Sequence, residues 1–200
     1  MQKWVSVLPS NAGIARPLAL LGALIGFLVT LPLLASFNAA TSAMQFVEKS
    51  SWIERFGINY HLGVDGISVL FILLNSFVTV LVVLAGWKVI ERRVAQYMAA
   101  FLIMSGLMNG TFAALDAILF YVFFEATLIP MYIVIGVWGG PNRVYAAFKF
   151  FLYTLLGSLL MLVGFIYLYF KAGGSFSILD FHALPLPLGA QSLLFVAFLL

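Results

Sequence analysis

The chain has 200 residues, of which 64% are apolar, 16% aromatic and only 8% charged. Soluble domains carry about 25% charged residues, so this composition excludes a soluble globular protein. The net charge of +3 comes from scattered Lys and Arg, which excludes a basic nucleic-acid binder, and the sequence has no Cys for disulfides, thiolate metal sites or cysteine-bound iron–sulfur clusters. An integral membrane protein remains, with the lipid bilayer as its surroundings.

Long hydrophobic runs predict how often the chain crosses the membrane. A hydrocarbon core of about 30 Å requires about 20 apolar residues of helix. Five runs reach or nearly reach this length, and a sixth is cut off after 12 residues: 17–37, 66–87, 94–115, 117–138, 144–170 and 189–200. We predict an all-α, polytopic transmembrane bundle, a single domain over 1–200 with five full spans and a truncated sixth. Because a complete span cannot stop at Leu200, we expect the chain to be a fragment of a larger polytopic protein.

The longest segment between predicted spans is 38–65. Counting Lys and Arg in alternate loops gives six on the N-terminal side and three on the other, which places this segment on the outer side. Met44–Glu48 and Ile58–Leu62 alternate loosely between apolar and polar residues and predict a short β-hairpin. Three apolar side chains of this loop are expected at the membrane interface: Trp52, Ile53 and Phe56.

Local signals predict where helices begin and how they pack. Asp65 and Asp116 directly precede the second and fourth spans and are expected to be their N-caps. Glycines one turn apart are expected to let a neighbouring helix backbone approach, and three polar side chains are expected to form interhelical hydrogen bonds. The glycine pairs are Gly22/Gly26 and Gly106/Gly110, and the polar residues are Asn109, Thr154 and Ser158.

An acidic residue, Glu125, lies near the middle of the fourth span. An isolated acid there costs about 2.5 to 3.5 kcal/mol on insertion scales, so a buried acid is a candidate functional group. Pro130 has no amide hydrogen, which frees the carbonyl of Ala126 beside the acid for a water molecule. Tyr121 lies one turn before Glu125 and Tyr132 two turns after it, so a polar stripe suited to proton relay follows one helix face. The alternative is a permanently protonated Glu125 that only joins helices.

A basic residue, Lys149, lies six residues into the fifth span, with Tyr145 and Tyr153 one turn before and after it. By helix rise it lies about 11 Å in depth from Glu125, which is too far for a direct ion pair and requires water or another ionisable group between them. The alternative is that the Lys149 ammonium snorkels to the interface.

The sequence contains no phosphate-binding loop and no nucleophile–base pair. His61 and His182 fall in predicted outer loops without partners at metal-ligand spacing, and we interpret both as ordinary loop histidines. We therefore expect no metal site and no cofactor-binding site on this chain.

Three stretches carry a resemblance to a known family: Phe123–Tyr132, Trp138-Gly139-Gly140 and Ala147–Thr154. They closely resemble the subunit M (chain 4) family of proton-pumping NADH:quinone oxidoreductases, respiratory complex I. His61–Ser68 is similar to that family's entry into its third helix. Related antiporter-like subunits, including those of multisubunit cation/proton antiporters, share the same plan.

The resemblance implies a 14-helix antiporter-like fold in which the acid matching Glu125 belongs to the proton pathway. It also implies that this acid works with a Lys on the helix matching 189–200, beyond Leu200, and that one further helix precedes Pro17. Lys149 matches a recurring polar position of the family. NADH, FMN, quinone and the iron–sulfur clusters are expected on partner subunits, so this chain carries no redox centre.

We therefore predict a proton-translocating membrane subunit of NADH:quinone oxidoreductase in a bacterial inner membrane, or alternatively an organellar one, surrounded by sibling membrane subunits. Glu125 is the predicted intramembrane proton carrier, with Lys149 in the same pathway and Pro130, Tyr121 and Tyr153 in support. The 200-residue product alone is expected to be inactive. The other hypotheses are a cation/proton antiporter subunit and a structural subunit whose buried acid transports nothing.

Overall fold

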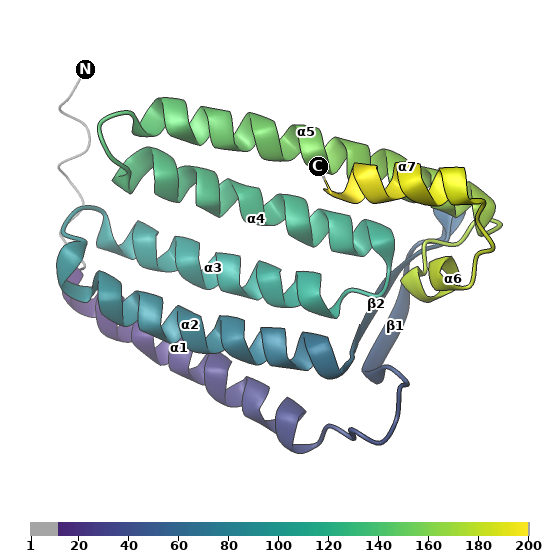
Figure 1. The fold of residues 1–200 in the computed structure, drawn as a ribbon. Coiled ribbons are helices and arrows are strands. Elements are labelled where there is room, and N and C mark those ends of the chain that lie inside the picture. The colour runs from purple at the N-terminus through teal and green to yellow at the C-terminus, as the bar shows by residue number, and fades with distance from the viewer. Residues whose placement is uncertain (1–11, 200) are drawn as a thin grey trace.

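The computed structural model describes residues 12–199 and is mostly helical (Figure 1). A two-stranded antiparallel hairpin interrupts the helices after the first one. In chain order the elements are α1 (Ala12–Ala35), β1 (Gln45–Ile53), the 3₁₀ turn η1 (Glu54–Phe56), β2 (Ile58–Val64), α2 (Gly66–Val89), α3 (Val94–Ala113), α4 (Ala117–Trp138), α5 (Arg143–Lys171), α6 (Ile178–His182) and α7 (Leu188–Leu199).

The long helices lie side by side in chain order, as Figure 1 shows, so each packs against its neighbours in sequence. Helix α1 contacts both α2 and α3, α4 lies between α3 and α5, and α7 packs against α5. The hairpin and the short α6 lie together at one end of these helices. This arrangement puts α4, the helix that carries Glu125, between α3 and α5.

Within the described residues, four helices are long and apolar enough to cross a membrane: α1 from Gly13 onward, α2, α4 and α5. Helix α3 occupies the predicted third span with 20 residues, but it is less apolar because polar side chains on it face α2. Helix α7 has 12 residues. The count of five spans and a truncated sixth therefore stays a prediction.

The first and third helices differ in extent from the predicted spans. The first helix begins at Ala12 and ends at Ala35, with Pro17 and Pro32 both inside it. Apolar runs mark the lipid-facing length of a helix and are a poor guide to its ends. The third helix ends at Ala113, two residues before the predicted end, because Ala114 forms a β-bridge with Leu62.

The predicted N-cap of α2 is confirmed. Asp65 Oδ1 accepts a hydrogen bond from the Ser68 amide at 2.7 Å, and the Ser68 hydroxyl accepts one from the Asp65 amide at 2.8 Å, which completes a capping box. Hydrogen bonds lower the pKa of Asp65, and the bond from the Ser68 amide contributes most. They outweigh the partial burial of the side chain, which raises this pKa.

The predicted N-cap of α4 is also confirmed, and it makes a further contact that the sequence does not show. Asp116 is only 1% exposed. Its Oδ1 accepts hydrogen bonds from the amides of Ile118 at 3.0 Å and Leu119 at 3.2 Å, while Oδ2 accepts one from the amide of Asn59 on β2 at 3.0 Å. One buried carboxylate thus joins the start of α4 to the hairpin.

Backbone hydrogen bonds extend this junction on both sides of the α3–α4 connection. The Leu115 amide donates to the His61 carbonyl at 2.8 Å, which joins the connection to β2. The Ala117 amide donates to the Phe176 carbonyl at 2.9 Å, and the Ile178 amide donates to the Leu115 carbonyl at 2.9 Å. The connection therefore lies between β2 and the segment that leads into α6, and it fixes the level at which α4 starts.

The predicted β-hairpin is confirmed, but its strands are longer than expected. Glu48 pairs with Leu62, and the ladder continues through Ser51 opposite Asn59, with irregularities on either side. Trp52 and Phe56 are about half exposed at 49% and 50%. Their predicted position at the membrane interface stays a prediction.

His61 lies on β2, within the predicted strand Ile58–Leu62, and it is only 7% exposed, a burial that the sequence did not indicate. Burial lowers the pKa of His61 most, and Lys49 lowers it further, while Asp116 and Asp180 raise it. His182 ends the short α6 and is exposed.

The expectation that glycines admit a neighbouring backbone was wrong at the predicted pairs. A Cβ on Gly110 would lie 2.8 Å from the Phe123 ring, and one on Gly22 would lie 3.7 Å from Leu102, so both glycines face side chains. Nothing lies within 4 Å of a Cβ on Gly26 or Gly106. Side chains therefore lie next to Gly22 and Gly110, and a cavity borders Gly26 and Gly106.

The three predicted polar residues behave differently from one another. Asn109 forms interhelical bonds as expected, accepting from Asn75 at 2.7 Å. The Thr154 and Ser158 hydroxyls donate to the carbonyls of Phe150 and Leu155 in their own helix, both at 2.9 Å, and of the two only Ser158 also lies close to a polar group of another helix, the Tyr121 hydroxyl. Such bonds are the usual local alternative for hydroxyls in a helix.

Replacing Asp116 by Ala in the full-length protein should destabilise it more than replacing Asp65 by Ala. Losing an N-cap costs about 1 kcal/mol in either variant. Asp116→Ala also removes the acceptor of the Asn59 amide, which is one of the hydrogen bonds that join α4 to the hairpin. The check is the thermal unfolding midpoint in detergent, and equal shifts for the two variants would contradict the proposed junction.

The hairpin should lose stability on acidification because of His61. Its pKa is lower in the folded than in the unfolded chain, so the unfolded state binds the proton more readily as the pH falls through the unfolded value of about 6.5. The penalty is absent above that pH and complete below the folded pKa. Unfolding midpoints at pH 7.5 and 5.5 should differ less for His61→Gln than for the unchanged protein.

Candidate functional site

Glu125 lies inside α4, between Tyr121 and Pro130 of the same helix. The helix begins at the Asp116 cap, which places Glu125 about 12 Å along the helix axis from Ala117. Its Oε1 is buried and has no hydrogen-bond partner within residues 12–199. Water or a protein partner must satisfy a buried carboxyl oxygen, since leaving it unmatched costs about 1 to 3 kcal/mol or more. Glu125 is therefore a polar group with unused binding capacity inside an apolar helix.

One backbone hydrogen bond of α4 is missing near Glu125. Pro130 lies inside α4 and is buried. Because proline has no amide hydrogen, the carbonyl of Ala126 cannot receive its usual helical bond. The hydroxyl of Thr127 donates to the Phe124 carbonyl at 2.6 Å. Polar backbone and side-chain atoms thus gather within one turn of the acid.

Tyr121 lies one turn before Glu125, and its hydroxyl is close to both Glu125 and Ser158 of α5. Ser158 is itself buried. A carboxyl, a phenol and a hydroxyl from two helices therefore meet between α4 and α5. Tyr132, which was expected to extend this stripe, packs edge-on against the rings of Phe148 and Phe151.

A cavity of about 240 Å³ lies beside this group, where α4, α5 and α7 meet. Ser158, Thr154 and Tyr153 supply its polar lining. The other lining residues are Phe124, Gly157, Met161, Ala197 and Phe198. Since one water occupies about 30 Å³ in the liquid, the cavity has room for several waters next to Ser158.

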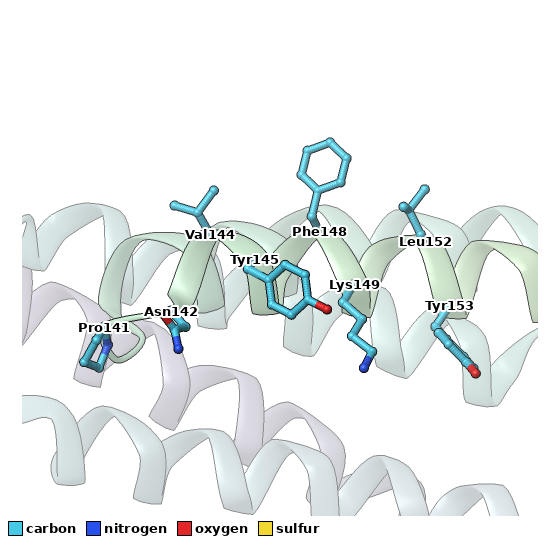
Figure 2. A pocket seen from close by; sticks show the side chains of 8 residues that line it. All are labelled: Pro141, Asn142, Val144, Tyr145, Phe148, Lys149, Leu152 and Tyr153. Carbon is cyan, nitrogen blue, oxygen red and sulfur yellow. The ribbon is translucent and has the colours of Figure 1, made fainter.

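Lys149 lies on a different face of α5, in an open groove of about 780 Å³. Figure 2 shows Tyr145, Lys149 and Tyr153 along one side of α5, while Val144, Phe148 and Leu152 point away from them. Both tyrosines are strongly exposed, at 71% and 75%. The predicted Tyr–Lys–Tyr face therefore exists and is turned outward from the helices described.

Tyr153 borders both the groove that holds Lys149 and the cavity next to Ser158. Within residues 12–199, no ion pair joins Glu125 to Lys149. The structure therefore brings Glu125, Tyr121 and Pro130 together on α4, keeps Lys149 apart on α5, and places Tyr153 between the two spaces.

The walls of the cavity were not found from the sequence. Phe198 becomes a neighbour of Gly157 and Met161 only because α7 packs against α5, where Gly164 meets the Phe198 ring. Periodicity within one helix carries no information about which helix covers it. Within the described part of the chain, no three His, Asp or Glu side chains gather as metal ligands would.

Two known families match consecutive parts of the sequence. Residues 16–113 match the family described as "NADH-ubiquinone oxidoreductase chain 4, amino terminus". Residues 114–200 match "NADH:quinone oxidoreductase/Mrp antiporter, TM". The two matches meet between α3 and α4.

Individual relatives agree with these families. The chain is 50% identical over 196 residues to "NADH-quinone oxidoreductase subunit M" of Rhodobacter capsulatus, which covers 92% of this chain and 38% of that protein. It is 45% identical over 165 residues to "NADH-ubiquinone oxidoreductase chain 4" of Arabidopsis thaliana, which covers 82% of this chain and 34% of that protein. The chain thus spans little more than a third of the length of these relatives.

Solved structures show the same fold. A chain of "Respiratory complex I from Thermus thermophilus with bound NADH" aligns with a TM-score of 0.80 at 33% identity, over 96% of this chain and 38% of that chain. A chain of the "Mrp complex from Dietzia sp. DQ12-45-1b" aligns with a TM-score of 0.80 at 17% identity, over 94% of this chain and 20% of that chain, which supports the fold alone. The chain belongs to the family of multi-pass membrane subunits that includes NADH-quinone oxidoreductase subunit M and chain 4.

Proposed function

We propose that this chain is part of a proton-translocating membrane subunit of NADH:quinone oxidoreductase, with Glu125 as the intramembrane proton carrier. The observation that carries the proposal is the buried Oε1 of Glu125, which has no hydrogen-bond partner within residues 12–199, on a side chain close to the Tyr121 hydroxyl. A carboxyl that takes up and releases a proton needs a changeable hydrogen-bonding environment. A carboxyl locked by protein donors would hold one protonation state.

The route toward Lys149 passes through Tyr153. From Glu125 the polar groups follow one another as Tyr121, Ser158 and the cavity that Tyr153 shares with the Lys149 groove. Several waters in the 240 Å³ cavity would complete the chain of hydrogen bonds. Lys149 then supplies a second ionisable group, with Pro130 keeping a backbone carbonyl free near the acid.

The chemistry of electron transfer belongs to other chains in this proposal. The sequence has no Cys. NADH, FMN, iron–sulfur clusters and quinone would be bound by partner subunits, and this subunit would sit among sibling membrane subunits in a bacterial inner membrane. Its contribution to the enzyme is to move protons when quinone reduction elsewhere drives the complex.

Glu125→Gln in the full-length subunit should lower coupled quinone reductase activity and proton pumping by at least about tenfold, since an amide carries no exchangeable acidic proton. The matched control is Glu91→Gln, which makes the same change at an exposed residue outside the helices. Near-normal coupled rates and ΔpH formation for Glu125→Gln would refute the carrier role.

The same variant distinguishes the proton-carrier hypothesis from the structural hypothesis. If Glu125 only holds helices together, Glu125→Gln should deplete the assembled complex on blue-native gels of the membrane fraction, with activity per assembled complex unchanged. The proposal expects the opposite, which is normal assembly with low activity per complex.

The family matched by residues 114–200 also includes Mrp antiporter subunits, so a cation/proton antiporter is the second candidate. Expression of the full-length protein with its neighbouring subunits in a sodium-sensitive strain tests it. Sodium-dependent restoration of growth would favour the antiporter, and its absence together with pumping coupled to quinone reduction would favour the oxidoreductase.

Tyr153→Phe should lower the coupled rate several-fold without affecting assembly, because only the hydroxyl shared by the groove and the cavity is removed. Tyr167→Phe on the same helix is the control, since Tyr167 lines neither space. Proton pumping in vesicles, normalised to assembled complex, is the measurement. Equal rates for the two variants would exclude the Tyr153 route.

A further inference from the structure

A second polar group lies inside the helical body, away from Glu125. The α2–α3 polar cluster consists of five uncharged side chains: Asn75, Ser76, Thr79, Ser105 and Asn109. Its central bond runs from Asn75 Nδ2 to Asn109 Oδ1 at 2.7 Å, and the Thr79 and Ser105 hydroxyls lie 2.8 Å apart. Asn109 Nδ2 donates to the Ser76 hydroxyl at 3.2 Å. Ser76 and Thr79 are buried, so these groups are removed from solvent.

A cavity of about 150 Å³ borders this cluster where α1, α2 and α3 meet. Ser76, Thr79, Ser105 and Asn109 form its polar side. Its remaining lining is Gly22, Ala23, Gly26, Phe27, Leu102 and Gly106. At about 30 Å³ per water, the volume fits a cluster of about four or five molecules.

The glycines keep this space open. Nothing lies within 4 Å of where a Cβ would stand on Gly26 or Gly106, and both are exposed at the rim of the cavity. A larger residue at either position would project into the space without a clash at its first carbon. Gly26 and Gly106 therefore line the cavity without contributing a side chain to it.

The cluster has hydrogen-bonding capacity that its internal bonds do not use. The bond to Ser76 takes one of the two amide hydrogens of Asn109, and Ser76 accepts in that bond and keeps its own hydroxyl hydrogen for another acceptor. Acyl chains and apolar side chains provide no partner for these atoms. Water can donate and accept in the same place.

We propose that this cavity is a hydration site within the membrane domain, in which a small water cluster bridges the hydroxyl and amide groups of α2 and α3. The lining contains no ionisable side chain, so a bound cation would keep an uncompensated charge in a low-dielectric setting, whereas water is neutral. The site is independent of the function proposed for Glu125.

The waters would matter because α3 supports the helix that carries Glu125. Gly110, next to Asn109, packs directly against the Phe123 ring of α4. Fixing the Asn109 turn of α3 therefore fixes the surface on which α4 rests. The expected role is positioning of α3, with no proton transfer assigned to it.

Hydroxyl-radical footprinting by X-ray radiolysis tests the site in the full-length subunit within its assembled complex, because radicals formed from bound water modify side chains that touch it. Phe27 and Leu102, which line the cavity, should be modified several-fold faster than Phe77 and Leu81, which are more exposed on the helix surface. Rates no higher than those of Phe77 and Leu81 would show a dry cavity and overturn the proposal.

Gly26→Val should fill the space and reduce modification of Phe27 and Leu102 to the level of Phe77. Gly13→Val is the matched control, since it adds the same side chain to α1 at another position with nothing within 4 Å. Unchanged modification in Gly26→Val would contradict the site. If this variant does not assemble, water density at Asn109 in a high-resolution map of the unchanged complex decides the question, and its absence overturns the proposal.

A further experiment distinguishes bound water from a bound cation in this cavity. Footprinting in sodium and in potassium buffers should give the same rates at Phe27 and Leu102. Selective protection in one of the two salts would identify a cation site and overturn the assignment to water.

Discussion

Hydrocarbon offers no hydrogen-bond partner, so each polar group among the spans must find one within the protein or in trapped water. The structure meets this constraint in different ways along the chain. Thr154 and Ser158 donate to carbonyls of their own helix, while Asn75 and Asn109 bond across two helices. Within residues 12–199, two buried side-chain atoms are left without a protein partner, Oε1 of Glu125 and Nε of Arg16.

At the hairpin end, the same constraint is met by a buried carboxylate. Asp116 satisfies amides at the start of α4 and one on β2, so the helix that carries Glu125 is anchored where it begins. The backbone bonds of Leu115 and Ala117 add the segment before α6 to this junction. The Asp116 junction fixes the start of α4, and Pro130 interrupts the backbone hydrogen bonding of the same helix five residues after Glu125.

Much of the architecture follows from the sequence because its causes are local. Helix length in apolar residues, the Asp65 and Asp116 caps, the alternation of the hairpin strands and the helical spacing of Tyr121 and Glu125 are all set within a few residues. The motifs around Glu125 and Lys149 also pointed to the right family. Local patterns were less reliable for helix ends, since Pro17 lies inside α1 and Ala113 ends α3 early.

The sequence by itself determined that this is a multi-pass helical membrane protein with an acid within one span, because composition and helical periodicity are properties of the chain. Only the tertiary structure decided that His61 is buried on β2, that Tyr153 borders two spaces, and that Asn75 meets Asn109. These facts depend on which helix faces which, and that choice results from packing between residues far apart in sequence. Long-range packing leaves no periodic trace in any one segment, so it could not be predicted from the segments alone.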